Sequence, residues 1–146
     1  MVRYSYDECI EDTRKIIKDL NKEYDAIIAI SRGGLTFAHL LASGLDLRTV
    51  HAINVASYDA TIQRESVAID TLPDLSQCRN VLIAEDIVDS GKSMHAVTQM
   101  LEEKYPTLHF DVAALFFKQT AIYTPKYFAR HATEWIQFCW EINEIL

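Results

Sequence analysis

The 146-residue chain has the size of one domain with a sizeable core, and none of its apolar runs approaches the length of a membrane span. Its net charge of −7 argues against general nucleic-acid binding, which depends on basic side chains that neutralise phosphates. The three cysteines, Cys9, Cys78 and Cys139, form no metal or redox motif, so we expect a single reduced, cytoplasmic domain over residues 1–146, without a nucleic-acid partner or stable membrane insertion.

The first half of the chain alternates helical and strand patterns. Residues 5–8 have the capping-box form S-x-x-E, which predicts the start of a helix with one apolar face. Residues 25–30 form an apolar run typical of a buried strand, and residues 50–55 predict a second strand. Between them, residues 35–43 are apolar nearly all round, which predicts a buried helix that ends at Gly44. The apolar face of the first helix consists of Ile10, Thr13, Ile17 and Leu20.

The second half continues this alternation. Because strands that alternate with helices form βαβ units, we expect an α/β fold with a mainly parallel sheet flanked by helices. The expected segments are a polar loop at 56–66, a short strand at 67–69, a buried strand at 81–84, a helix at 92–104 with Met94, Val97 and Leu101 inward, a strand at 110–117, a mostly irregular stretch at 118–133 and a short apolar tail at 135–140.

Residues 81–93 are the most informative segment. An apolar run ends at the adjacent carboxylates Glu85 and Asp86, and a third carboxylate, Asp89, follows. Ligands of open α/β sheets bind beyond the carboxyl ends of the strands, and small residues at a helix start leave backbone N–H groups free to hold an anion. The segment therefore predicts a phosphate cradle beside acids that can face ribose hydroxyls or a metal. The residues of this cradle are Asp89, Ser90, Gly91, Lys92 and Ser93.

Two other interpretations of this segment are open. Gly91, Lys92 and Ser93 look like the tail of a P-loop, but that motif needs a glycine at the position of Asp86. The segment is otherwise an acidic loop before a helix that Ser90 or Ser93 caps. The segments around it decide between these interpretations.

A second candidate site lies at 31–34, just after a predicted strand, where the sequence reads Ser-Arg-Gly-Gly. Two glycines let the backbone approach a ligand closely, and Arg32 can make a bidentate contact with phosphate oxygens. The alternative is a tight turn between strand and helix with a solvated arginine.

In this order, the loop at 31–34 and the segment at 81–93 resemble the pyrophosphate loop and the phosphoribosyl-pyrophosphate signature of the purine phosphoribosyltransferases. The tail at 134–141, with Trp135 and Trp140 before an acid, is similar to that of the bacterial xanthine–guanine members. The resemblance implies a small C-terminal hood on the α/β fold. It implies transfer of a 5-phosphoribosyl group from phosphoribosyl pyrophosphate to a 6-oxopurine (guanine, xanthine or hypoxanthine). It also implies Mg²⁺ as cofactor and a homo-oligomer, either a dimer or a tetramer.

The same resemblance implies the residues of the donor site. Glu85 and Asp86 would hold the ribose hydroxyls, directly or through a metal, and Glu141 would help to hold that metal. The cradle at 89–93 would bind the 5′-phosphate. The polar loop would close over the pyrophosphate and exclude water. The pyrophosphate contacts would come from Ser31, Arg32, Gly33 and Arg64, with a cis peptide bond between Ser31 and Arg32.

The resemblance also implies the residues of the base site. Asp89 would accept a proton at the five-membered ring of the purine, and Lys118 would donate to the carbonyl oxygen at C6. Trp135 would stack on the base, and the backbone of Ile136 would meet its edge. The chain departs from the family where Cys139 stands in place of the usual proline.

Two further functions stay open. The acceptor could be another base, adenine or a pyrimidine, although the ammonium of Lys118 donates to a carbonyl and not to an amino group. The fold also serves nucleotide-sensing regulators, and the net charge of −7 without a basic cluster argues against that role.

Two acids, Glu85 and Glu141, are longer than the acids that are common in the family.

Overall fold

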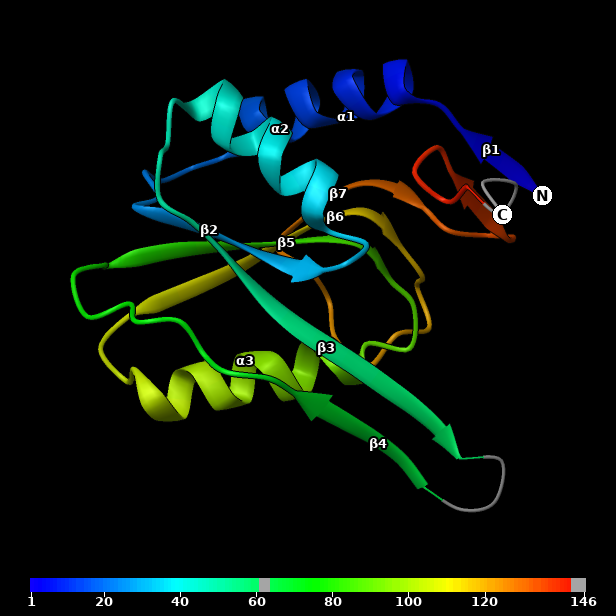
Figure 1. Cartoon of the computed structure of the whole chain (residues 1–146). Coiled ribbons are helices and arrows are strands. Elements are labelled where there is room, and N and C mark those ends of the chain that lie inside the picture. The colour runs from blue at the N-terminus through cyan, green and yellow to red at the C-terminus, as the bar shows by residue number, and fades with distance from the viewer. Residues whose placement is uncertain (61–63, 143–146) are drawn as a thin grey trace.

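A computed structural model describes residues 1–60 and 64–142, with the backbone alone for residues 57–60 and 64–66 (Figure 1). Its elements, in chain order, are β1 (Val2–Tyr4), α1 (Tyr6–Asp19), β2 (Ala26–Ser31), α2 (Leu35–Leu45), β3 (Val50–Ala60), β4 (Arg64–Ile69), β5 (Asn80–Val88), α3 (Lys92–Lys104), β6 (His109–Phe117), β7 (Tyr127–His131) and β8 (Ile136–Phe138).

The main sheet has the strand order β4-β3-β2-β5-β6-β7. Its neighbouring strands pair in parallel, except for β3 and β4, which pair antiparallel. Helices α1 and α2 cover one face of this sheet, and α3 covers the other (Figure 1). The expected α/β fold, with a mainly parallel sheet between helices, is therefore confirmed. Among the helices of the described residues, none is both long enough and apolar enough to cross a membrane.

The central strands β2 and β5 are buried on both faces, which explains their nearly continuous apolar sequences. Because successive residues of a strand point to opposite faces, Ile27 and Ile28 enter different cores. Ile27 shares a core with Phe37 of α2, whereas Ile28 shares one with Val97 of α3. These two cores hold β2 and β5 side by side, so the loops that follow both strands meet at one edge of the sheet.

The N-terminal strand and the C-terminal tail form a separate two-stranded sheet. Strand β1 pairs in parallel with β8, with Val2 opposite Ile136 and Tyr4 opposite Phe138. Tyr4 is buried, and its ring meets the rings of Phe116 and Phe138 edge to face. This small sheet is the hood that was expected from the tail, and it includes the N-terminal strand, which the sequence analysis did not predict (Figure 1).

Two segments that were expected to be irregular contain strands. In the segment at 56–66, β3 runs through Ala60 and β4 begins at Arg64, so backbone pairing replaces most of the expected loop and forms an arm beyond α3 (Figure 1). The expectation of a loop that closes over pyrophosphate falls mainly on residues 61–63, which lie outside the described residues. In the segment at 118–133, β7 adds to the sheet beside β6.

The helices confirm one prediction and correct two. The capping box is present, since the Ser5 hydroxyl accepts from the Glu8 N–H and the Glu8 carboxylate accepts from the Ser5 N–H. The buried face of α1 is rotated from the predicted one and includes Asp12, because Asp12 has polar partners in Tyr4 of the hood and Arg130 of β7. Helix α2 continues past Gly44 to Leu45, and one of its faces is exposed. That face consists of Leu35, His39 and Ser43.

Candidate active site

The two adjacent acids lie inside the last residues of β5, rather than after the strand as predicted. The Glu85 carboxylate accepts from the Asp86 N–H at 3.0 Å, and the Asp86 carboxylate accepts from the Ile87 N–H at 2.7 Å. Both side chains are half-buried. Burial raises the pKa of Glu85 well above its usual value, and the charge of Asp86 raises it further; burial also raises the pKa of Asp86. A bound cation or hydroxyl donors would therefore stabilise the charged forms of this pair.

The loop after β2 lies directly against this acid pair. The Ser31–Arg32 peptide bond is cis, as the resemblance implied. The Gly34 N–H donates to the Ile30 carbonyl at 2.8 Å, which turns the chain into α2. A Cβ atom at Gly33 would collide with the Asp86 carboxylate, so glycine is what allows the loop to pack this closely on β5.

A pocket of about 760 Å³ lies between these two loops. Its walls include Arg32, which follows β2, Asp86, at the end of β5, and Glu141, in the hood. Arg32 and Asp86, which are far apart in the sequence, line one pocket because β2 pairs in parallel with β5. Of the residues predicted to bind the donor, those that line this pocket are Ser31, Arg32, Gly33, Glu85, Asp86, Ser93 and Glu141.

The predicted phosphate cradle is the turn between β5 and α3. Gly91 caps the helix with φ of 83°, a left-handed conformation that favours glycine, and the cap has no side-chain hydrogen bond. Neither Ser90 nor Ser93 therefore caps the helix as the alternative interpretation required. The Lys92 N–H donates to the Ser90 hydroxyl at 3.2 Å, and the Ser90 carbonyl accepts from the Ile122 N–H at 2.8 Å. These two bonds fix the backbone of the turn, which lies at the positive end of the α3 dipole.

A second pocket, of about 410 Å³, lies under the hood and contains every residue predicted for the base site. The Lys118 ammonium lies 3.4 Å from the Asp89 carboxylate, and both side chains are more than half exposed. An exposed ion pair of this kind contributes little to stability, so both groups are available to a ligand. The residues of the base site that line this pocket are Asp89, Lys118, Trp135 and Ile136.

The two pockets share a wall, because Asp86 and Glu141 line both of them. A donor in the larger pocket and a base in the smaller one would therefore meet at Asp86. Trp135 leaves 73% of its surface exposed, so its ring can cover a ligand that enters the smaller pocket. This arrangement suits transfer of a group between two ligands that bind side by side.

Known proteins are similar to this chain in sequence and fold. Residues 3–143 match the phosphoribosyl transferase domain family. A solved xanthine-guanine-hypoxanthine phosphoribosyltransferase of Helicobacter pylori is 35% identical, with a TM-score of 0.89 over 97% of this chain and 94% of that one. A purine phosphoribosyltransferase of Pyrococcus horikoshii is 25% identical, with a TM-score of 0.84 over 99% of this chain and 97% of that one. The curated xanthine-guanine phosphoribosyltransferase of Idiomarina loihiensis is 28% identical over 95% of this chain and 86% of its own length.

The chain belongs to the phosphoribosyltransferase family. The family expected from the sequence is thereby confirmed. Arg64 opens β4, and its side chain lies outside the described part of the structure. Ser90, Gly91 and Lys92 lie at the start of α3, next to the pockets rather than in their walls.

The acids of this phosphoribosyltransferase fit magnesium as part of a ligand set. Within residues 1–60 and 64–142, no three His, Cys, Asp or Glu side chains converge to hold a metal ion. Mg²⁺ usually binds through one or two carboxylates, waters and the phosphates of a substrate rather than in a cage of protein ligands. In the half-buried pair of Glu85 and Asp86, burial disfavours both charged forms and the charge of Asp86 further disfavours that of Glu85, so the pair fits a cation of that kind.

Trp140 is among the residues of the larger pocket that sequence reasoning did not assign to the site. Its ring stacks on Phe138 with a centroid distance of 4.9 Å and an interplanar angle of 13°. It lines the larger pocket together with Asp86 and Glu141. The second tryptophan of the tail was the available signal, but only the packing of the hood shows which pocket it faces.

Proposed function

We propose that this phosphoribosyltransferase transfers a 5-phosphoribosyl group from phosphoribosyl pyrophosphate to a 6-oxopurine. The observation that supports this best is the separation of 3.4 Å between Lys118 and Asp89 in the smaller pocket. Guanine presents two acceptors, O6 and N7, side by side on one edge. A donor and a proton acceptor at this separation match O6 and a protonated N7, whereas adenine offers an amino group where Lys118 needs an acceptor.

On the donor side, the roles follow from position. The bond between ribose C1 and pyrophosphate breaks as the purine nitrogen N9 approaches, so positive charge grows on the sugar and negative charge on the leaving group. Arg32 and the amides of its loop stabilise the pyrophosphate. Glu85 and Asp86 hold the ribose hydroxyls and stand near the growing positive charge. The turn at 89–93 binds the 5′-phosphate at the start of α3.

Magnesium would be held by Glu85, Asp86 and Glu141 together with the donor, and it would neutralise charge on the pyrophosphate. The Glu141 carboxylate accepts from the Phe138 N–H at 3.4 Å, so it would reach the metal from the hood. Arg64 would reach the pyrophosphate from the start of β4.

On the base side, Asp89 removes the proton from N7 as the new bond between N9 and C1 forms. Lys118 donates to O6 and holds the base in that orientation. Trp135 covers the face of the ring, and the Ile136 backbone meets its edge. Closure of the hood over these groups excludes water, which protects the ribosyl cation from hydrolysis.

Release of pyrophosphate tests this proposal. The protein is mixed with phosphoribosyl pyrophosphate and magnesium, and guanine, xanthine, hypoxanthine and adenine are added in turn, with a mixture that lacks any base as the control. We expect release with at least one 6-oxopurine and very little with adenine. Rates with adenine that rival those with guanine would instead assign an adenine enzyme. Donor binding without release with any base would favour a nucleotide-sensing protein.

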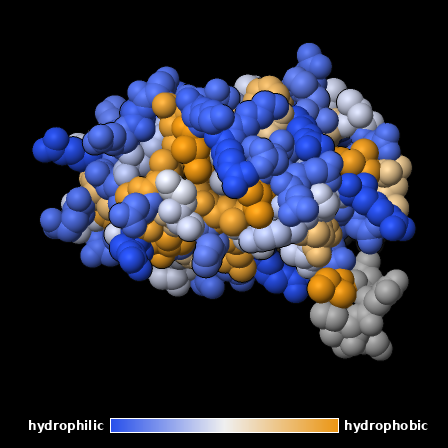
Figure 2. Space-filling view, turned by 90° about the horizontal axis from the view of Figure 1, so that it is seen from above, coloured by the Kyte–Doolittle hydropathy of each residue, from blue (hydrophilic) through white to orange (hydrophobic). Residues whose placement is uncertain are grey.

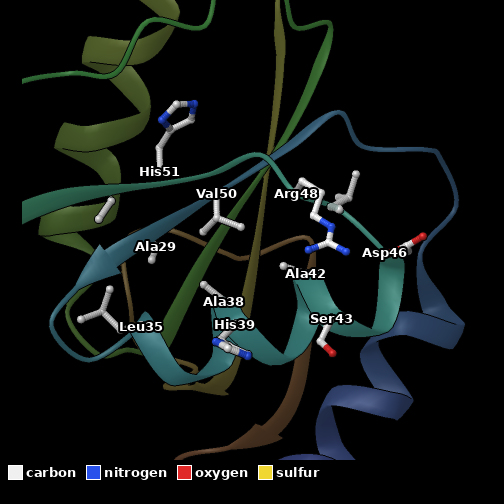
Figure 3. Close-up of a pocket in the computed structure, with 12 residues that line it drawn as sticks. Ala29, Leu35, Ala38, His39, Ala42, Ser43, Asp46, Arg48, Val50 and His51 are labelled. Atoms are coloured by element: carbon white, nitrogen blue, oxygen red, sulfur yellow. The ribbon is translucent and has the colours of Figure 1, made fainter.

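We also propose that residues 1–146 act as one cytoplasmic domain in a homo-oligomer. A hollow of about 650 Å³ lies between α2 and β3, and it shares Leu35 with the wall of the larger pocket (Figure 3). Leu35 and Val50 are about half exposed there, and the face over α1 and α2 shows apolar surface near its middle (Figure 2). Asp46 and Arg48 lie at its edge, as opposite charges that a second copy related by a twofold axis would complement.

Analytical ultracentrifugation tests this part of the proposal. Val50→Asp places a charge in the hollow without touching the two pockets, so we expect it to convert the oligomer to a monomer. Gln99→Asp, on the exposed surface of α3, is the control and should leave the oligomer intact. A wild-type protein that sediments as a monomer would contradict the proposal.

A further inference from the structure

The indole N–H of Trp140 is unusual within the described part of the chain. It is the one buried side-chain nitrogen or oxygen there that has no hydrogen-bond partner. Buried polar groups nearly always have partners, so such an exception points to a missing ligand or to a rearrangement on binding. Trp140 lines the donor pocket beside Asp86, and its proximity lowers the pKa of that carboxyl, which burial raises.

The ring of Trp140 is held rigidly from behind. One face stacks on Phe138, and its edge meets the Tyr4 ring at a centroid distance of 6.4 Å and an angle of 89°. Offset stacks and edge-to-face contacts of this kind fix the orientation of an aromatic side chain. The indole therefore has little freedom to turn, and its N–H stays near its present position.

Tyr4 is itself fixed by a buried polar network. Its hydroxyl donates to the Asp12 carboxylate at 2.7 Å, and the same carboxylate oxygen lies 2.8 Å from Nε of Arg130. The Arg130 guanidinium also lies over the Tyr4 ring, 5.2 Å from its centroid, and contacts Glu8 at 3.2 Å. Burial and the bond to Asp12 raise the pKa of Tyr4, so the hydroxyl keeps its proton and stays a donor.

We propose that Trp140 is a positioning residue of the donor pocket, whose indole N–H orients the Asp86 carboxylate when phosphoribosyl pyrophosphate binds, and that Tyr4 of the N-terminal strand holds Trp140 in place. The sequence of contacts runs from Arg130 and Asp12 through Tyr4 and Trp140 to Asp86. It gives the N-terminal strand, far from the signature segment in sequence, a part in donor binding. The inference rests on the proposed function, because it takes the larger pocket as the donor site.

Titration calorimetry with phosphoribosyl pyrophosphate and magnesium, without any purine, tests the first step. Trp140→Phe keeps a ring against Phe138 and Tyr4 but removes the N–H. A hydrogen bond to a charged group contributes enough that its loss should weaken donor binding roughly tenfold or more. In steady state, the KM for the donor should rise by a similar factor, and the KM for the purine should change much less. A merely structural role would move both constants together.

The outcomes separate this inference from the proposed function. No binding of phosphoribosyl pyrophosphate by the unmodified protein would overturn the proposed function and the inference with it. Equal donor affinities of the unmodified protein and Trp140→Phe would overturn the inference alone. Equal rises of both KM values would also overturn it, since they would indicate a general distortion of the site.

Variants at Tyr4 test the second step. Tyr4→Phe loses the bond to Asp12 and keeps the ring, whereas Tyr4→Leu also loses the edge-to-face contact with Trp140. We expect donor affinity to fall slightly in the first and nearly as far as in Trp140→Phe in the second. Tyr105→Phe is the matched control, because its hydroxyl bonds the Pro73 carbonyl on the α3 side of the sheet. Donor affinity that falls equally in Tyr4→Leu and Tyr105→Phe would overturn this step.

Discussion

The Lys118 ammonium and the Asp89 carboxylate lie 3.4 Å apart, although the two residues belong to different strand ends. Parallel pairing of β5 with β6 places Val88 opposite Phe117, so the next residue of each strand reaches the same edge of the sheet. Both side chains are exposed to the smaller pocket rather than locked in the core. A cation and an acid at this separation can address two neighbouring atoms of one ligand.

Replacement of Asp89 separates proton transfer from donor binding. Asp89→Asn keeps the shape of the side chain but removes its ability to accept a proton. Because a positioned base typically contributes about 10²–10⁴-fold, we expect kcat with guanine to fall by a factor in that range while the Kd for phosphoribosyl pyrophosphate changes little. Steady-state kinetics and donor titration measure the two quantities. A loss confined to donor affinity would reassign the Asp89 side chain to a contact with the ribose.

Replacement of Lys118 tests the choice of base. Lys118→Met keeps an unbranched side chain beside Phe117 and removes the donor for O6. A site built around a hydrogen bond discriminates strongly against a partner that leaves it unpaired, so kcat/KM should fall roughly 10²-fold for guanine and hypoxanthine alike. Melting temperature should change little, because the ion pair is exposed. Unchanged rates with both bases would exclude contact between Lys118 and O6.

Local patterns were enough to predict the central strands of the main sheet, but not β7 at its edge. Helix α3 has the bounds expected from the sequence, since Gly91 precedes it and Pro106 follows it closely. The apolar runs that became β2, β5 and β6 were recognisable because each strand is buried over most of its length. Their ends differ from the prediction by a few residues, because backbone pairing continues past the last apolar side chain.

Pairing between distant segments could not be predicted in the same way. Strands β1 and β8 have only three residues each and exist because they pair with one another. No periodicity is visible over so short a run. The same holds for Asp12. Its charged side chain predicts an exposed position on the helix, but it is buried because Tyr4 and Arg130 approach it from the hood and β7.

The site was predictable in its residues but not in its packing. The segments at 31–34 and 81–93 carry recognisable chemistry in their order along the chain. That Gly33 must pack against Asp86, and that Trp140 faces the donor pocket, depends on how β2, β5 and the hood come together. The contacts of an aromatic ring depend on which residues pack around it in the fold, and local sequence patterns do not predict these residues.

Gly91 is expected to be the most sensitive glycine of the phosphate cradle. Its φ of 83° is unfavourable for other residues, and a Cβ atom there would lie 2.6 Å from the Tyr123 backbone nitrogen. Gly91→Ala should therefore lower the free energy of unfolding by about 1–2 kcal/mol or more and weaken donor binding through movement of the turn. Chemical denaturation and donor titration measure the two effects. Full stability in Gly91→Ala would contradict the strained geometry.

The acid pair at the end of β5 should make the ligand-free protein less stable as the pH rises. Burial and the charge of Asp86 raise the pKa of Glu85 above its value in the unfolded chain, so the folded state binds more protons. The contribution of Glu85 to the free energy of unfolding is therefore complete below its pKa in the unfolded chain. It is lost as the pH rises through its pKa in the folded protein. Glu85→Gln removes this effect, so its melting temperature should match that of the unmodified protein near pH 4 and exceed it at pH 8, with EDTA present to remove divalent cations. Glu103→Gln, on the exposed end of α3, is the control and should show no such divergence. Parallel melting curves for Glu85→Gln and the unmodified protein across this range would rule out a strained acid pair in the empty site.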